Sequence, residues 1–197
     1  MLVLVRHGEA AGNAERKLLG RSQSPLTERG RAEAAALAPM VRGAGRLVTS
    51  PLQRCRDTAS ALGLSVPIEV DERWVEVDYG DFEGCSLSEV PRATWQRWRS
   101  DPHDPWPGGE SLADVGLRVR ACCEELFARE GTGARADADV VVVSHVSPIK
   151  AAVAWALGAG DELAWKLYLA TASVTRIAWA ADGPVLRSYN ETVLSPG

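Results

Sequence analysis

The chain has 197 residues, enough for one domain with a sizeable hydrophobic core. Its formal net charge of −4 argues against nucleic acid as a partner, although an acidic protein can still hold a small anion in a cationic pocket. Only five apolar residues precede the first arginine, too few for a signal-peptide core or a membrane span, so no membrane partner is expected.

The chain opens with an alternation of short β-branched runs and helical patterns, which is typical of an α/β fold. A buried strand is predicted at residues 2–5, and Thr27 predicts the N-cap of the first long helix. Pro39 should kink or end that helix. The inward face of the helix is expected to carry Ala32, Ala35, Ala36 and Met40.

The same pattern of strand, helix and strand then repeats. Residues 47–48 are predicted as a short second strand, and residues 67–70 as a third. Between these strands, Ser50 is interpreted as the cap and Pro51 as the first residue of a helix that runs to Gly63.

Residues 78–109 are dense in aspartate, glycine, proline and tryptophan, so we expect an irregular excursion with a short helix at residues 92–99. Ser111 then predicts the start of an amphipathic helix, in which Asp114 takes the acidic position of a capping box. The inward face of this helix is expected to contain Leu112, Val115, Val119, Cys122 or Cys123, and Leu126.

The last third of the chain completes the predicted sheet. After a small loop at residues 131–138, four consecutive valines make Asp139–Ser144 the clearest buried strand. A helix is predicted to begin at Ser147 and to end at Gly158. Two further strands are predicted at Ser173–Ala180 and at residues 184–189. We therefore expect a single α/β domain over residues 1–197.

Cysteine and histidine spacings bear on the compartment and on metals. The cysteines show no CxxC spacing, which favours free thiols in a cytoplasmic protein over a disulfide framework. The histidines are not spaced like ligands on one helix or in a zinc finger, so no metal site is expected. The residues concerned are Cys55, Cys85, Cys122, Cys123, His7, His103 and His145.

Polar residues follow three of the predicted strands. Arg6 and His7 follow the first strand, Arg54 lies shortly after the second, and His145 follows the valine strand. Since ligands bind at the carboxyl edge of parallel α/β sheets, these four residues should converge there. Two guanidinium groups suit a phosphate dianion, with charge-assisted hydrogen bonds of about 1.5–3 kcal/mol each. The helix that follows His145 would add backbone amides and the positive end of its dipole.

His7 and Glu76 are the candidates for chemistry at such a site. Nearby cations should lower the pKa of His7 and keep its ring neutral and nucleophilic near pH 7. Glu76 is a candidate proton donor for the departing alkoxide. Three of the candidate site residues also have a purely structural interpretation. Glu76 could belong to a solvated acidic loop, Arg54 could lie on an exposed helix face, and His145 could be an ordinary histidine at a strand end.

Six segments together resemble the histidine phosphatase superfamily, also called phosphoglycerate mutase-like. In chain order they are VRHGEAAGN, LLGRSQSPLTERG, TSPLQRCRDTA, RWVEVDYGDFEG, PGGESLADVGLRV and VVVSHVSPIKAAVAWALG. The resemblance runs from about residue 2 to residue 190. It implies a three-layer α/β sandwich with a mostly parallel central sheet, and it implies no metal and no organic cofactor.

The resemblance also implies roles for individual residues. His7 would attack phosphorus and become phosphohistidine, and Glu76 would protonate the leaving group and then help water hydrolyse the intermediate. The phosphoryl oxygens would be bound by Arg6, Asn13, Arg54, His145 and Val146. The chain departs from the family pattern in having Ala10 where threonine is common, and Val146 and Ser147 where glycines are frequent.

The superfamily contains both mutases and phosphatases, and the fold does not decide between them. The stretch at residues 85–109 does not resemble the basic substrate-clamping insert of mutases, which favours a phosphatase of the alpha-ribazole phosphatase-like or broad-specificity branch. The expected partner is a small phosphate ester of undetermined identity. The alternatives are a cofactor-dependent phosphoglycerate mutase and a non-catalytic module that binds phosphorylated ligands. The oligomeric state is left open, with a homodimer as one alternative.

Overall fold

The structure, a computed structural model, describes residues 1–130 and 138–193. Within these residues a six-stranded sheet has the order β3-β2-β4-β1-β5-β6. The strands are β1 (Leu2–Arg6), β2 (Ala44–Thr49), β3 (Ile68–Val70), β4 (Asp139–Ser144), β5 (Ser173–Ala180) and β6 (Gly183–Thr192). The first four run parallel, β5 is antiparallel to β1, and β6 is antiparallel to β5. Apart from residue 138, the predicted loop at 131–138 lies outside the described residues.

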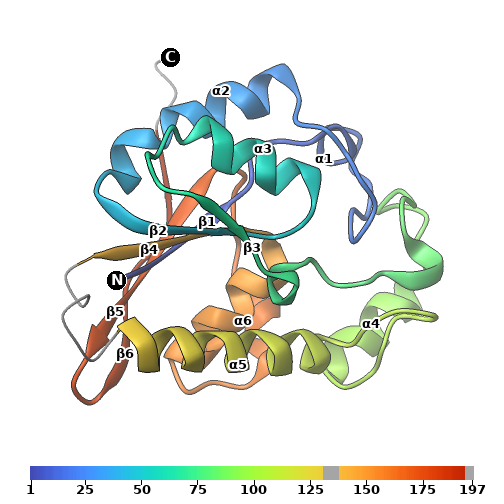
Figure 1. Ribbon diagram of the computed structural model, residues 1–197. Coiled ribbons are helices and arrows are strands. Elements are labelled where there is room, and N and C mark those ends of the chain that lie inside the picture. Colours follow the sequence, from blue (N-terminus) through green and yellow to red (C-terminus); the bar gives the residue numbers. More distant parts are fainter. Residues whose placement is uncertain (131–137, 194–197) are drawn as a thin grey trace.

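Helices cover both faces of this sheet (Figure 1). On one face lie α2 (Glu28–Ala36) and α3 (Gln53–Ala61), and on the other α5 (Leu112–Glu130) and α6 (Val146–Ala156). The arrangement is the predicted three-layer α/β sandwich. The remaining helices of the described residues are α1 (Ala11–Ala14), α4 (Arg92–Ser100) and four 3₁₀ helices, η1 (Ala38–Val41), η2 (Glu72–Trp74), η3 (Gly80–Phe82) and η4 (Asp161–Lys166).

The central strands are buried on both faces, and therefore they read as continuous apolar runs in the sequence. Along β1, Leu2 and Leu4 belong to the core under α5 and α6. Val3 and Val5 belong to the core under α2 and α3, because successive side chains point to opposite faces of a sheet. The parallel register pairs Arg6 with Ser144, so the residues after β1 and β4 meet at one edge.

The predicted start of α2 is confirmed, but its predicted inward face is wrong. Thr27 caps the helix, and its Oγ1 accepts a hydrogen bond from the Gly30 N–H at 2.9 Å. The buried residues are Gly30, Ala34 and Leu37, whereas three residues predicted to face inward are exposed: Ala32, Ala35 and Ala36. A run of alanines has little hydrophobic contrast, so the larger Leu37 decides which face turns inward.

The helix α3 begins two residues later than predicted, with Leu52 and not Ser50 at its N-cap. Ser50 continues the edge of the sheet, since its N–H donates to the carbonyl of Val143 at 3.0 Å. Its hydroxyl instead contacts His145, with Oγ 2.8 Å from Nε2. The end of the helix is as predicted, because Gly63 has a left-handed φ of 63° just after the last turn.

The helices of the other face follow the predictions closely. The capping box of α5 is present: the Asp114 N–H donates to Ser111 Oγ at 3.1 Å, and the Ser111 N–H donates to Asp114 Oδ2 at 3.0 Å. The helix α6 begins at Val146, one residue earlier than predicted, with His145 as its N-cap. None of the helices described is long and apolar enough to cross a membrane.

Candidate active site

The C-terminal ends of β1, β2 and β4 bring four of the predicted site residues to one edge of the sheet. Arg6 is the last residue of β1 and His7 follows it, while His145 follows β4. Arg54 lies in the first turn of α3, just after β2. The rings of His7 and His145 lie edge to face, with centroids 5.1 Å apart. The convergence expected from the strand ends is therefore present.

His7 is buried and its ring orientation is fixed by the backbone. Nδ1 lies 2.7 Å from the carbonyl oxygen of Gly8. Because a carbonyl only accepts hydrogen bonds, Nδ1 carries the proton and Nε2 keeps its lone pair. Burial, followed by the positive charges of Arg54 and Arg6, holds the pKa of His7 well below its usual range. The ring is thus neutral at neutral pH, with a nucleophilic nitrogen available.

The loop after His7 is held by α3 and α2. The Gly8 N–H donates to Thr58 Oγ1 at 3.1 Å, and the Thr58 hydroxyl donates to the Arg54 carbonyl at 2.7 Å. A Cβ on Gly8 would lie 2.2 Å from the carbonyl oxygen of Gly30, so this position requires glycine. Thr58 was missed by sequence reasoning, and its only signal is its position one helical turn after Arg54.

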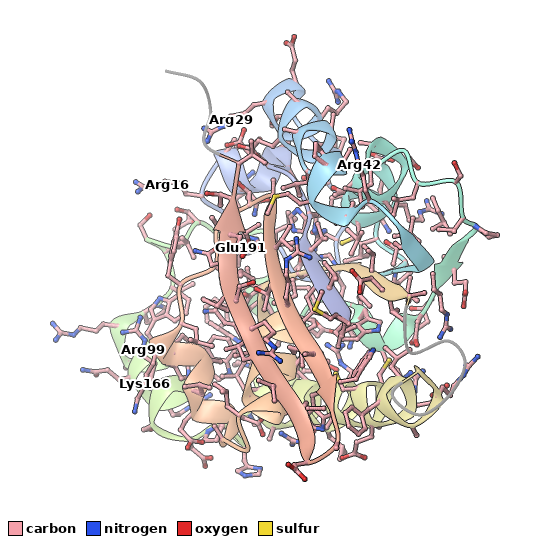
Figure 2. All side chains as sticks on the ribbon, turned by 90° about the vertical axis from the view of Figure 1, so that its left-hand side faces the viewer. Arg16, Arg29, Arg42, Arg99, Lys166 and Glu191 are labelled. Atoms are coloured by element: carbon pink, nitrogen blue, oxygen red, sulfur yellow. The ribbon has the colours of Figure 1, made fainter. Side chains whose placement is uncertain are left out.

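Arg54 is fully buried, so the alternative of an exposed helix face is wrong. Its Nε donates to His145 Nδ1 at 3.2 Å, Nη1 to the Ser22 carbonyl at 2.9 Å and Nη2 to the Gly20 carbonyl at 2.6 Å. Burial lowers the pKa of Arg54, and nearby groups, Glu76 among them, oppose this effect. Figure 2 shows the contrast with basic residues on the surface, such as Arg16, Arg29, Arg42, Arg99 and Lys166.

His145 is also fully buried, and both of its ring nitrogens contact protein groups. Nδ1 must accept, because Arg54 Nε only donates, and so Nε2 carries the proton and donates to Ser50 Oγ at 2.8 Å. Burial, then the charge of Arg54, holds the pKa of His145 well below its usual range. Ser50 is a site residue that sequence reasoning missed, because Ser-Pro was interpreted as a helix start.

Glu76 lies buried at the N-terminus of α6, so the alternative of a solvated acidic loop is wrong for this residue. Its Oε2 accepts the N–H of Val146 at 3.0 Å, and its Oε1 accepts the N–H of Ser147 at 3.1 Å. The carboxylate therefore occupies the amides and the positive dipole end that were expected to face a phosphate. Arg6 and Arg54 are both close enough to Glu76 to interact with its charge.

Arg6 and Asn13 differ in their relation to this cluster. Arg6 donates from Nη1 to the Leu169 carbonyl at 2.6 Å, and its buried Nε has no hydrogen-bond partner among the described residues. Asn13 lies in α1, and its Oδ1 accepts the N–H of Ala10 at 3.1 Å. Asn13 therefore closes the turn after the nucleophile loop.

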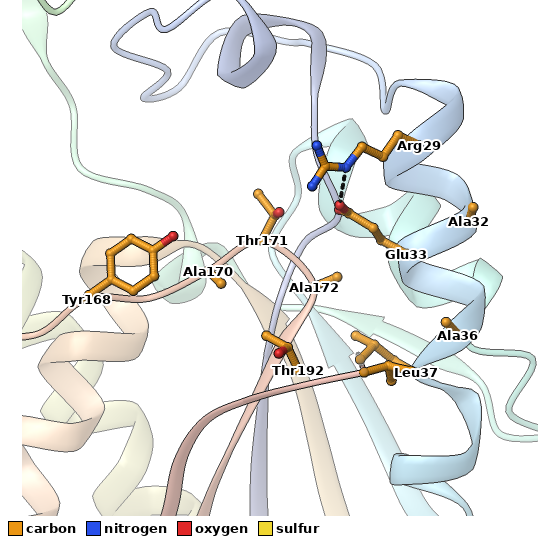
Figure 3. Close-up of a pocket in the computed structure, with 11 residues that line it drawn as sticks. Arg29, Ala32, Glu33, Ala36, Leu37, Tyr168, Ala170, Thr171, Ala172 and Thr192 are labelled. Atoms are coloured by element: carbon orange, nitrogen blue, oxygen red, sulfur yellow. Dashed lines mark hydrogen bonds and ion pairs between the residues drawn. The ribbon is translucent and has the colours of Figure 1, made fainter. Parts of the chain in front are cut away.

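A pocket of about 490 Å³ opens at the same edge, between α2 and the segment before β5 (Figure 3). Arg29 and Glu33 form an ion pair of 2.8 Å on its α2 side, and Tyr168 lies across from them. The pocket adjoins the backbone of His7, whose carbonyl accepts the N–H of Ala172 at 3.1 Å. None of the predicted site residues lines it. Among the described residues, no cluster of three or more His, Cys, Asp or Glu could hold a metal ion.

Comparisons with known proteins agree on one family. The model of the histidine phosphatase superfamily (branch 1) matches residues 2–192. A bifunctional protein of Mycobacterium tuberculosis is 37% identical over 201 residues, which cover 97% of this chain but only 54% of that protein. The chain thus spans about half the length of this relative.

Two further relatives match over most of their own length. Phosphoserine phosphatase 1 of Hydrogenobacter thermophilus is 33% identical over 199 residues, covering 97% of this chain and 92% of that protein. The solved structure of a mycobacterial glucosyl-3-phosphoglycerate phosphatase in complex with VO3 is 30% identical, with a TM-score of 0.88, and covers 97% of this chain and 99% of that one.

Proposed function

Because this chain belongs to the histidine phosphatase superfamily, we propose that it hydrolyses phosphate monoesters of small metabolites through a phosphohistidine intermediate at His7. The observation that carries the proposal is the state of the His7 ring. Its Nδ1 is bonded to the Gly8 carbonyl, its Nε2 keeps a lone pair, and burial beside two arginines keeps it neutral. A module that only binds phosphorylated ligands would need neither this nucleophile nor a proton donor.

In the first step, the Nε2 lone pair of His7 attacks phosphorus and the bond to the ester oxygen breaks. Glu76, protonated at that moment, gives its proton to the departing alkoxide and becomes a carboxylate. Arg6 and Arg54 stabilise the charge that develops on the phosphoryl oxygens. We assign His145, Asn13 and the Val146 amide to the same phosphoryl site. His145 would donate from its Nε2–H, which now faces Ser50, Asn13 from its side-chain Nδ2–H, and Val146 from the N–H that Glu76 now accepts.

In the second step, water attacks phosphorus and the phosphorus–nitrogen bond breaks. The Glu76 carboxylate takes a proton from the water, while neutral His7 is regenerated and inorganic phosphate leaves. No residue other than these two changes its covalent or protonation state. The proposed cycle therefore needs only the ester and water.

The substrate is proposed to be a small phosphate ester, in line with the relatives named for phosphoserine and glucosyl-3-phosphoglycerate. The alternative function is that of a mutase. It is favoured by a relative named as a 2,3-bisphosphoglycerate-dependent phosphoglycerate mutase, which is 34% identical to this chain. We also propose one domain over residues 1–197, since both core clusters pack against one sheet, and a cytoplasmic location, in line with the free cysteines.

The proposal is tested with a panel of phosphate esters. The purified chain is incubated with p-nitrophenyl phosphate, phosphoserine, glucosyl-3-phosphoglycerate and 3-phosphoglycerate, the last with and without 2,3-bisphosphoglycerate. We expect release of inorganic phosphate from at least one ester. In His7→Ala the rate of this release should fall at least a thousandfold, because the nucleophile is missing. Exposed His103 provides the matched control, His103→Ala, with unchanged activity.

Two outcomes would contradict the proposal. Near-normal hydrolysis by His7→Ala would remove His7 as the nucleophile. Formation of 2-phosphoglycerate that depends on the bisphosphate, faster than release of inorganic phosphate, would favour the mutase.

A further inference from the structure

The loop at residues 19–22 turns its carbonyl oxygens toward the guanidinium of Arg54. Nη2 of Arg54 donates to the Gly20 carbonyl at 2.6 Å, and Nη1 donates to the Ser22 carbonyl at 2.9 Å. A longer contact of 3.4 Å joins Nη2 to the Leu19 carbonyl. Because Arg54 is fully buried, the position of this loop determines how the guanidinium is oriented beside His7.

Glu83 holds the same loop from its N–H side. Its Oε1 accepts the Gly20 N–H at 2.9 Å, the Ser22 N–H at 3.2 Å and the Ser22 hydroxyl at 2.5 Å. Its Oε2 accepts the Gly20 N–H at 3.2 Å. The two residues whose carbonyls make the shorter bonds to Arg54, Gly20 and Ser22, are thus the two whose N–H groups bind Glu83.

The contact between the loop and Glu83 leaves little freedom. A Cβ on Gly20 would lie 2.4 Å from Glu83 Oε2 and 2.6 Å from the Val77 carbonyl, so the backbone is pressed against both. Backbone hydrogen bonds continue the contact: the Gly84 N–H donates to the Leu18 carbonyl at 2.9 Å, and the Leu18 N–H donates to the Cys85 carbonyl at 2.8 Å. The irregular segment at residues 78–109 therefore fixes the position of the loop at residues 19–22, and this loop in turn binds Arg54.

We propose that Glu83 is a positioning residue for phosphoryl binding: it fixes the loop at residues 19–22, whose carbonyls orient Arg54 toward the oxyanion at His7. The proposal rests on the proposed function, since it presupposes that Arg54 binds phosphoryl oxygens. A guanidinium that is already oriented loses less freedom when it binds an oxyanion. The charge of Glu83 also acts on Arg54 and opposes the effect of burial on its pKa.

The test is a double-mutant cycle read by binding of orthovanadate, a phosphoryl mimic, in titration calorimetry. Glu83→Gln removes the charged acceptor at nearly constant size, and it should raise the Kd for orthovanadate about tenfold. In an Arg54→Lys background the same change should raise the Kd less than twofold, because the forked group to be oriented is gone. Glu89→Gln, an exposed carboxylate on the same irregular segment, is the control for lost charge and should leave the Kd unchanged.

A merely structural role for Glu83 predicts equal losses in both backgrounds, and that result would overturn the proposal. So would an unchanged Kd in Glu83→Gln. If Glu83→Gln does not fold, Ser22→Ala removes one hydrogen bond to the same carboxylate. This change should raise the Kd for orthovanadate two- to threefold when Arg54 is present and should have a smaller effect in the Arg54→Lys background. Failure of the wild type to bind orthovanadate would instead overturn the proposed function, and this inference with it.

Discussion

The two buried histidines of the site differ in what their ring nitrogens contact. Within the described part of the chain, His7 uses only Nδ1, on a backbone carbonyl, whereas His145 uses both nitrogens, on Arg54 and Ser50. A neutral imidazole with one free lone pair is a nucleophile, and one with both nitrogens engaged is a fixed dipole. The chemical roles of the two residues are therefore separated by their hydrogen bonds.

Glu76 is the residue for which substrate chemistry provides a sharp prediction. If Glu76 protonates the leaving group, Glu76→Gln should lower kcat/KM for phosphoserine, an alkyl ester, by about 100-fold or more. The loss with p-nitrophenyl phosphate should stay below about tenfold, because nitrophenolate departs without a proton. The measurement is kcat/KM on both esters, which covers substrate binding and phosphorylation of His7 but not the later hydrolysis of the intermediate.

A control and a contrary outcome complete this comparison. Glu72→Gln removes an exposed carboxylate four residues away and should change neither value. Glutamine at position 76 also disturbs the amides of α6, but this effect is common to both esters and cancels in their ratio. Equal losses on both esters would count against Glu76 as the acid.

Sequence reasoning at this scale predicted which residues meet but not what each one contacts. Arg6, His7, Arg54 and His145 converge because parallel strands end at one edge. The partners of Arg54 are backbone carbonyls, and these carry no signature in the sequence. The role of Ser50 was hidden for a related reason, since Ser-Pro is equally compatible with a helix cap.

At the scale of elements, a contact between two glycines sets how closely α2 approaches the nucleophile loop. A Cβ on Gly8 would lie 2.2 Å from the Gly30 carbonyl, and a Cβ on Gly30 would lie 2.0 Å from the Glu9 carbonyl. Gly30 lies in the first turn of α2, where Thr27 Oγ1 also accepts its N–H. The first turn of the helix thus packs directly on the backbone that carries His7.

This contact reverses the usual effect of alanine in a helix. Gly→Ala inside a helix normally stabilises a protein by roughly 0.5–1 kcal/mol. Gly30→Ala should instead destabilise this protein by more than about 1 kcal/mol and lower kcat/KM at least tenfold, because its Cβ meets backbone atoms of the nucleophile loop. Urea unfolding and steady-state kinetics measure the two effects.

The matched control for this prediction is Ala35→Gly, at an exposed position of the same helix. It should cost about 1 kcal/mol of stability and leave kcat/KM unchanged, since it alters helix propensity alone. A more stable Gly30→Ala variant with normal kinetics would show that the contact does not hold the loop.

Helices and strands with a strong hydrophobic pattern were predicted correctly. The errors occur where neighbouring residues differ little in hydrophobicity. The valine run of β4 was predicted to the residue, and the spacing of apolar residues along α5 with its capping box was predicted as well. The predicted inward face of α2 was wrong, because five of its nine residues are alanine or glycine, which differ little in hydrophobicity. Packing of Leu37 decides such a face, and packing is a property of the whole fold.

At the scale of the whole molecule, the site and the stability of the fold share the same buried groups. His7 and His145 are enclosed between α3, α6 and the sheet, and burial is the first cause of the lowered pKa of each. The order of the strands, with β4 inserted between β1 and β2, creates this enclosure. Strand order could not be predicted from the sequence, because it depends on contacts between residues far apart in the chain.

The lowered pKa values of the two histidines predict how stability depends on pH. An unfolded histidine has a pKa of about 6.5, so below this pH the unfolded chain binds protons that the folded protein does not bind. The stabilising contribution of the neutral rings is therefore complete above about pH 6.5 and is lost as the pH falls from there toward the folded pKa values. With two such rings, the free energy of unfolding should fall by up to about 2.7 kcal/mol per pH unit in this window.

Urea unfolding between pH 7.5 and 5 measures this slope, and variants assign it. His7→Asn and His145→Asn should each reduce the slope by about 1.4 kcal/mol per pH unit, because each removes one group that binds a proton only in the unfolded chain. His103→Asn changes an exposed histidine and should leave the slope as it is. A wild-type stability that stays flat through this window would mean that the folded protein binds these protons as readily as the unfolded chain does. His7 would then be protonated below about pH 6.5, and burial beside two arginines would not keep its lone pair free for phosphoryl transfer.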